Sequence, residues 1–276
     1  MEEKSKESLV RIEKESIVTE KKSWIPESLQ EFLITVGDMS HFTLRFFKEF
    51  LKPPYEFNEF FRQCFEIGYK SFPLVGITGF IMGLVLTIQS RPTLAEFGAE
   101  SWLPGMVAIS IVREIGPVIT ALICAGKVGS GIGAELGSMK VTEQIDAMEV
   151  SGTKPFKYIV VTRVLATMLM LPILVACADA VAFYGSYIGV NIKGHVSFVL
   201  FFAQAFDSLE FIDVIPAFIK CFFFGFAIGI VGCYKGYNSE NGTEGVGAAA
   251  NSAVVVSSLL VFIIDMIAVQ VTDLLM

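Results

Sequence analysis

Charged residues and the residues of metal or redox chemistry are scarce in this chain. Only 18% of its 276 residues are charged, against about a quarter in ordinary soluble domains. The five cysteines form no CxxC pair and show no metal-ligand spacing with His41 or His195, so we expect no disulfide framework, metal site or cofactor in this chain. The net charge of −7 and the lack of a basic stripe argue against a nucleic-acid binder.

The chain has long apolar segments instead. Its residues are 53% hydrophobic, and its mean hydropathy is +0.62. A membrane-spanning helix needs about 20 mostly apolar residues, and five segments fit this length: 71–89, 106–132, 161–190, 213–234 and 246–271. We therefore predict an all-α integral membrane protein with five transmembrane helices. Residues 196–206 are apolar but too short to span, which indicates a re-entrant or interfacial helix.

The first 70 residues have a different character from the rest. Residues 1–22 are polar and predict a disordered cytoplasmic tail. Within 23–70, apolar residues recur every three or four positions between Leu29 and Phe50, but charges interrupt them. This pattern predicts interfacial elbow helices that lie along the membrane surface, with an ordinary soluble helical hairpin as the alternative. A second aromatic stretch, 55–70, leads into the domain of five predicted spans over 71–276.

The distribution of lysine and arginine predicts the orientation. Basic residues concentrate in the N-terminal region and in the 133–160 loop, whereas the 90–105 and 191–212 loops carry one each. Because cytoplasmic loops are enriched in lysine and arginine, we expect the N-terminus and the 133–160 loop on the cytoplasmic side. With five spans, the C-terminus then lies outside.

Charged residues inside the predicted spans are candidate functional residues, because they are unfavourable in lipid and usually face a partner or a wet cavity. Arg113, Glu114, Asp179 and Asp265 all fall in the outer half of the membrane and are expected to form one charge cluster. We expect Arg113 to pair with Asp265 or Asp179, and Glu114 to face a cavity. Lys220 lies at a similar depth but is long enough to snorkel outward. A purely structural ion-pair cluster is the alternative.

Two features near the cytoplasmic end suggest packing and docking. Gly129, Gly133 and Gly137 lie four residues apart, which favours close helix packing in a membrane. Residues 142–144 (Thr-Glu-Gln) resemble a helix start, followed by a short amphipathic pattern with acidic residues. Such a helix is either a docking element for a soluble partner or a solvated loop helix.

Residues 112–150 read VREIGPVITALICAGKVGSGIGAELGSMKVTEQIDAMEV. This stretch resembles the MlaE-type permease family, the membrane subunits of ABC transporters that work with MCE proteins. The resemblance continues through ITGFIMGLVLTIQ (77–89), TRVLATMLMLPIL (162–174) and residues 257–265.

The resemblance implies a homodimeric permease in the bacterial inner membrane. It implies a separate cytoplasmic ABC ATPase that holds ATP and Mg, a periplasmic MCE-domain protein, and a small cytoplasmic regulatory subunit. Such complexes move phospholipids between the inner and outer membranes and support outer-membrane lipid asymmetry. Residues 139–151 match the family's coupling helix, with the ATPase-coupling positions Glu143, Gln144, Asp146, Ala147, Met148 and Glu149. Arg113 and Glu114 match the family's polar pair near the lipid cavity.

The expected mechanism involves no covalent chemistry in this chain, so we do not expect an enzyme. An apolar outer cavity would open and close, with walls formed by Leu84, Ile88, Gln89, Trp102, Met106, Arg113 and Glu114. One alternative is an ion-coupled secondary transporter that uses Glu114, Asp179 and Asp265 as a proton relay. Another is a non-transporting membrane scaffold. An intramembrane hydrolase built on Ser110 is a distant third.

Overall fold

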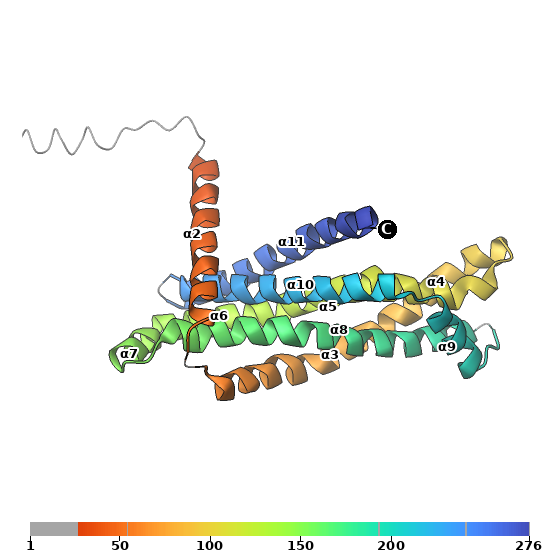
Figure 1. Cartoon of the computed structure of the whole chain (residues 1–276), viewed down its shortest axis with the longest axis horizontal. Helices are drawn as coiled ribbons and strands as arrows, with labels where there is room; N and C mark the ends of the chain where they lie inside the picture. Colours follow the sequence, from red (N-terminus) through yellow and green to blue (C-terminus); the bar gives the residue numbers. More distant parts are fainter. Residues whose placement is uncertain (1–26, 54, 193, 241, 276) are drawn as a thin grey trace, which may run out of the picture. The chain divides into compact units, whose positions relative to one another are not determined.

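The computed structural model describes all residues except 1–26, 54, 193, 241 and 276. The described residues form helices and no strand (Figure 1). Their contacts divide the chain into two units, residues 1–42 and 43–276. Helix α2 (Glu27–Phe50) begins in the first unit and ends in the second. The predicted tail, 1–22, lies outside the described residues.

The prediction of an all-α protein with five membrane-spanning helices is confirmed. Five helical segments are long and apolar enough to cross a membrane: Phe57–Glu96, Glu100–Val141, Phe156–Asn191, Phe211–Tyr237 and Thr243–Leu274. The first is α3, the fourth is α10 and the last belongs to α11 (Thr243–Leu275). Each helix extends beyond the apolar run that predicted it, and the aromatic stretch 55–70 enters α3 without a break at Lys70.

The second and third spans contain π-helical turns. The second consists of η1 (Glu100–Trp102), α4 (Leu103–Ser110), η2 (Ile111–Ile115), α5 (Gly116–Cys124), η3 (Ala125–Gly129) and α6 (Ser130–Val141). The third consists of η4 (Phe156–Val161) and α8 (Thr162–Asn191). Of these, η2, η3 and η4 are π-helical. Pro117 follows η2 and has no N–H to bond the carbonyl of Arg113, which favours a wider turn there.

Helices α3 and α8 lie side by side (Figure 1) and approach each other closely at glycines. A Cβ atom on Gly79 would lie 2.7 Å from the carbonyl oxygen of Ala178, and one on Gly185 would lie 3.3 Å from the Leu84 nitrogen. Small residues permit such backbone contact. This pair forms one side of the bundle.

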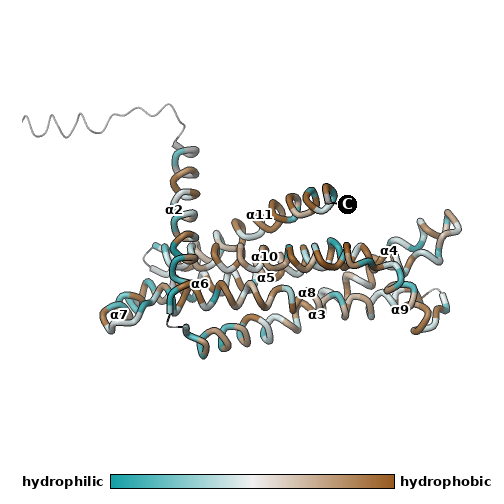
Figure 2. The backbone as a smooth tube through the Cα atoms, in the orientation of Figure 1, coloured by the Kyte–Doolittle hydropathy of each residue, from teal (hydrophilic) through white to brown (hydrophobic). Residues whose placement is uncertain are grey.

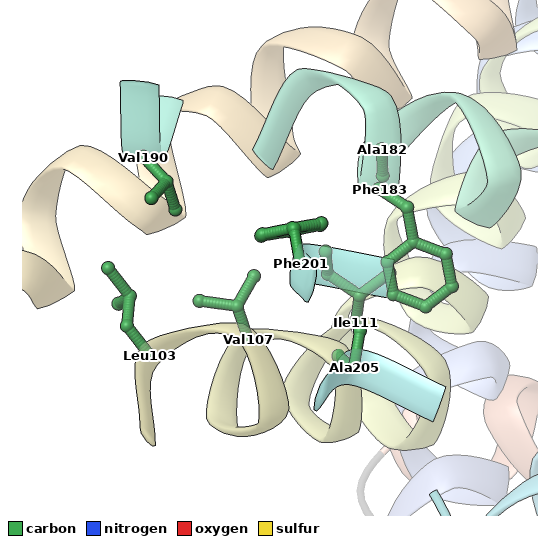
Figure 3. Packing of buried hydrophobic residues seen from close by; sticks show 9 residues of the cluster. Leu103, Val107, Ile111, Ala182, Phe183, Val190, Phe201 and Ala205 are labelled. Carbon is green, nitrogen blue, oxygen red and sulfur yellow. The ribbon is translucent and has the colours of Figure 1, made fainter. Parts of the chain in front are cut away.

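The short apolar segment near residue 200 forms helix α9 (Phe198–Asp207). The Ser197 side chain caps it by accepting a hydrogen bond from the Leu200 N–H at 3.3 Å. Figure 3 shows its buried face against α4 and α8. The buried cluster consists of Leu103, Val107, Ala108, Ile111, Ala182, Phe183, Val190, Phe201 and Ala205. The α9 helix is therefore fixed to the ends of two spans.

Helix α11 packs along only part of its length. Ala249, Ala253, Ser257 and Val261 are buried at four-residue intervals. The first two lie against Gly133 of α6, and Ser257 lies against Gly129 of η3. Beyond these residues, the C-terminal half of α11 diverges from α10 (Figure 1). Only 17% of the most apolar stretch of α11 is buried, against 67% of the corresponding stretch of the third span. The remaining faces of α11 are hydrophobic, whereas hydrophilic residues gather on the short helix α7 (Gln144–Val150; Figure 2).

The predicted glycine stripe lies in the contact between α6 and α11. A Cβ on Gly133 would lie 3.3 Å from the Ala249 carbonyl oxygen, and one on Gly137 would lie 3.5 Å from the Val246 Cα. Gly129 lies against Ser257 in the same way, at 3.4 Å. The absence of side chains at these positions brings the two backbones together near the α7 end of the bundle.

Candidate functional site

A buried lysine joins three helices inside the predicted membrane region. The Lys220 Nζ atom on α10 lies 2.8 Å from Glu114 Oε2 in η2. The same nitrogen lies 2.8 Å from Asp265 Oδ1 on α11. Only 4% of Lys220 is exposed, whereas the Glu114 and Asp265 side chains are 37% and 19% exposed. Charge-assisted hydrogen bonds of this length are among the strong ones.

An arginine makes a second set of contacts between the same three elements. Arg113 Nη2 lies 3.2 Å from Asp273 Oδ1 at the end of α11. Its Nη1 lies 3.7 Å from Asp213 Oδ1 in the first turn of α10. Asp213 also accepts a hydrogen bond from the Glu210 N–H at 3.2 Å, which caps α10. We call Arg113, Glu114, Asp213, Lys220, Asp265 and Asp273 the charge cluster; its formal charge is negative because four acids meet two bases.

The expected pairing of Arg113 with Asp265 or Asp179 is wrong. Asp265 pairs with Lys220 instead, and Lys220 points into the bundle rather than snorkelling outward. Arg113 and Glu114 adjoin in sequence, but their side chains leave the π-helical turn η2 in different directions and reach different partners. Depth along the membrane does not reveal this angular separation.

Among the described residues, Asp179 forms no ion pair with the charge cluster. It is 9% exposed, and its Oδ1 atom has no hydrogen-bond partner among the described residues. Its carboxyl packs against Gly116, where a Cβ would lie 3.0 Å from Asp179 Cγ. A pocket of about 200 Å³ beside it is lined by apolar side chains that include Val112 and Phe183. The described residues therefore do not join Asp179 to Glu114 and Asp265 in one hydrogen-bonded chain.

An apolar pocket adjoins the charge cluster between α10 and α11. Its volume is about 810 Å³, within the roughly 300–1,000 Å³ typical of ligand pockets. Its lining residues are Phe211, Ile212, Ile215, Pro216, Ile219, Lys220, Phe223, Ile264, Ile267, Ala268, Val271 and Thr272. Lys220 is the charged residue of this wall, and it also borders the narrow polar pocket of Arg113 and Glu114. The site thus places charges at the edge of a large apolar volume, which suits an amphiphile.

None of the seven residues expected to line the lipid cavity lines this pocket. Arg113 and Glu114 line the narrow pocket beside it, and the other five lie elsewhere. Leu84, Ile88 and Gln89 lie on α3, which contacts α8 rather than α11. Trp102 and Met106 lie at the beginning of the second span, and Trp102 is 75% exposed. The sequence does not show which helices are neighbours, so it did not indicate that α10 and α11, rather than α3, lie beside Glu114.

Sequence reasoning missed Asp213 and Asp273 as members of the charge cluster. Asp273 follows Asp265 by eight residues, which is close to two helical turns and places both acids on a similar face. That spacing was a usable signal. Asp213 had no comparable signal. Its position three residues after Glu210 indicates a helix cap and not a contact with Arg113.

The predicted docking stretch forms a short helix at the other end of the bundle. Glu143 precedes α7 with a left-handed φ of 58°, and Gln144, Asp146, Ala147 and Glu149 are exposed. Met148 is half-buried, and Ile145 anchors the helix, being only 1% exposed. Asp146 pairs with Lys140 at 3.6 Å. The helix is therefore held to the bundle by Ile145 and exposes the acidic and polar side chains of Gln144, Asp146 and Glu149.

Comparison with known proteins agrees with the resemblance seen in residues 112–150. The family model described as permease MlaE matches residues 60–271. A probable ABC transporter permease protein of Rickettsia typhi is 40% identical over 233 residues, covering 84% of this chain and 90% of the relative. The intermembrane phospholipid transport system permease protein MlaE of Haemophilus influenzae is 34% identical over 208 residues, covering 75% of this chain and 79% of the relative.

Proposed function

Because the chain belongs to the MlaE permease family, we propose that it is the permease subunit of an ABC transporter that moves phospholipids between the inner and outer membranes. A permease of this kind is a transporter membrane subunit and not an enzyme. The observation that carries the proposal is the apolar pocket of about 810 Å³ between α10 and α11 with Lys220 in its wall.

The chemistry of a phospholipid matches both parts of this site. Acyl chains gain free energy when they leave water for an apolar wall, and the α10–α11 pocket supplies one. The lipid phosphate would compete with carboxylates for Lys220 and Arg113, while an amine head group would be attracted to the excess acids. Exchange of these ion pairs would couple lipid entry to movement of η2, α10 and α11, which the cluster links.

The partners we propose follow from the exposed surfaces. An ABC ATPase, holding ATP and Mg, would bind α7 on the cytoplasmic side, where a small regulatory subunit would also act. A second copy of this chain would cover the exposed apolar faces of α11, giving a homodimer. A periplasmic MCE-domain protein would receive or deliver the lipid. Loop lysines support a bacterial inner-membrane orientation with the N-terminus cytoplasmic and the C-terminus periplasmic.

The α3 residues expected to contact lipid remain a prediction for the transport path. Leu84→Arg should block lipid loading, because a charged side chain there would be unfavourable beside acyl chains. Normal transport by this variant would exclude Leu84 from the path.

Affinity purification of the tagged chain from native membranes tests the proposal. We expect an ATPase and an MCE-domain protein to co-purify with bound phospholipid, identified by mass spectrometry, and the complex to hydrolyse ATP. Glu143→Lys on the α7 surface should lower ATPase activity. Glu96→Lys makes the same charge change at the far end of α3 and should leave it unchanged. A lipid-free chain without any ATPase would contradict the proposed function.

A further inference from the structure

A second pocket lies at the α7 end of the bundle, away from the charge cluster. It opens between the α2–α3 linker, the first turn of α3 and the beginning of the third span, and its volume is about 330 Å³. Its lining residues are Phe50, Tyr55, Glu56, Phe57, Phe60, Lys157, Val161, Thr162 and Leu165. We call it the linker pocket. Most of its wall is aromatic or aliphatic, which suits a hydrocarbon chain.

Lys157 is a buried cation in this wall. Only 5% of the residue is exposed, its Nζ donates a hydrogen bond to the Lys52 carbonyl oxygen, and it lies 5.1 Å from the centre of the Tyr55 ring. Among the ion pairs of the described residues, none includes Lys157. An ammonium group has three donors, and a buried charge is unfavourable unless it is paired.

The nearby acidic residues have other partners or positions. Glu59 is buried but accepts hydrogen bonds from Arg62 at 3.0 Å and Gln63 at 2.7 Å. Glu49 pairs with Lys52 at 3.0 Å. Glu56 is the acid that lines the linker pocket, without an ion pair to Lys157. The pocket therefore combines an apolar volume, a buried cation that forms no ion pair among the described residues, and one acid in its lining.

We propose that the linker pocket binds a phospholipid, with an acyl chain among the aromatic residues and the phosphate beside Lys157. The phosphate would supply the missing counter-charge, and charge-assisted contacts of this type are strong. Glu56 favours a head group that also carries an amine. The apolar wall favours an amphiphile over free phosphate, which would gain nothing from Phe57, Phe60 and Leu165. This site is independent of the proposed transport path, because it shares no lining residue with the α10–α11 pocket.

Photo-crosslinking of the full chain tests the site. The probe is a phosphatidylethanolamine with a diazirine on one acyl chain, added to the purified protein in detergent micelles, with labelled peptides located by mass spectrometry. We expect labelling within residues 50–60 and 157–165. Lys157→Met should reduce this labelling about tenfold, since it removes a charge-assisted contact. Lys154→Met removes an exposed charge three residues away and should leave labelling unchanged.

A second variant tests the site independently if Lys157→Met does not fold. Leu165→Trp fills the pocket from α8 while retaining Lys157 and should also abolish labelling, whereas Lys157→Arg should retain it. Unchanged labelling in Leu165→Trp, or in folded Lys157→Met, would overturn the proposal. Protection of these peptides by inorganic phosphate alone would indicate a free-phosphate site and would also overturn it. Lipid transport is not measured, so failure here leaves the proposed function unaffected.

Discussion

Lys220 shows how a single side chain can define a site inside a membrane protein. Its ammonium group lies between carboxylates from η2 and α11, and it borders the largest apolar volume described above. A charge at this depth needs its partners, since desolvation is unfavourable and lipid offers no compensation. The three helices are therefore linked by electrostatics as well as by packing.

Removal of this lysine should destabilise the protein. Lys220→Met leaves Glu114 and Asp265 close together without a cation, and breaking a buried pair of this kind lowers stability by about 3–5 kcal/mol. Thermal unfolding in micelles measures the loss, with exposed Lys154→Met as the matched control. Adding Glu114→Gln and Asp265→Asn to Lys220→Met should restore most of the stability. A Lys220→Met protein as stable as the control would contradict the assigned contacts.

The sequence predicted three of the six charged residues in the cluster, Arg113, Glu114 and Asp265, because they interrupt apolar runs. It did not predict their pairing, and it placed Asp179 in the cluster while leaving Lys220 outside it. The pairs depend on angles around helices and on the π-helical turn at η2, which apolar periodicity does not encode.

Helices α3 and α8 depend on backbone contact at small residues. A Cβ on Gly83 would lie 2.7 Å from the Ala182 carbonyl carbon, whereas one on Gly76 in the same helix would meet nothing within 4 Å. Gly83 is thus packed against the α8 backbone, whereas Gly76, about two helical turns earlier, has open space beside it.

Alanine substitution should distinguish these two glycines. Gly83→Ala should lower the unfolding free energy by about 1–3 kcal/mol through overpacking. Gly76→Ala should be neutral or raise it by about 0.5–1 kcal/mol, because alanine favours a helix. Thermal unfolding of both variants measures the difference. Equal effects would mean that α3 and α8 are not in backbone contact.

Two substitutions of Glu143, at the beginning of α7, test its backbone strain and its surface charge separately. Glu143 adopts a left-handed φ of 58°, which is unfavourable by roughly 1–2 kcal/mol for a residue other than glycine. Glu143→Gly should therefore raise stability by about 1 kcal/mol in thermal unfolding. Glu143→Lys retains the strain and should leave stability unchanged while lowering ATPase activity in the purified complex. A stability loss in Glu143→Gly would contradict the local geometry.

Element positions were more predictable than element ends. The five spans follow from apolar length, but their helices continue into amphipathic segments such as 57–70, which apolar length does not detect. Prolines within α3, α8 and α10 do not end these helices either. The short α7 and α9 helices carried clearer local signals, an acidic amphipathic pattern and an isolated apolar run.

At the scale of the molecule, helix neighbours determine where a ligand fits. The sequence could not indicate that α11 packs on α6 near its beginning and diverges from α10 towards its end (Figure 1). That divergence creates the α10–α11 pocket. The large exposed fraction of α11 is the surface that the proposed second copy of this chain would cover.

In the proposed function, phospholipid moves through this chain at the expense of ATP that a separate subunit hydrolyses. The most direct test reconstitutes the chain with its ATPase and MCE-domain partners in liposomes and follows transfer of a fluorescent phospholipid. We predict transfer that requires ATP, stops when the ATPase is omitted and continues when an ionophore collapses the proton gradient. Transfer that persists without the ATPase and stops with the gradient would contradict the account and indicate an ion-coupled transporter.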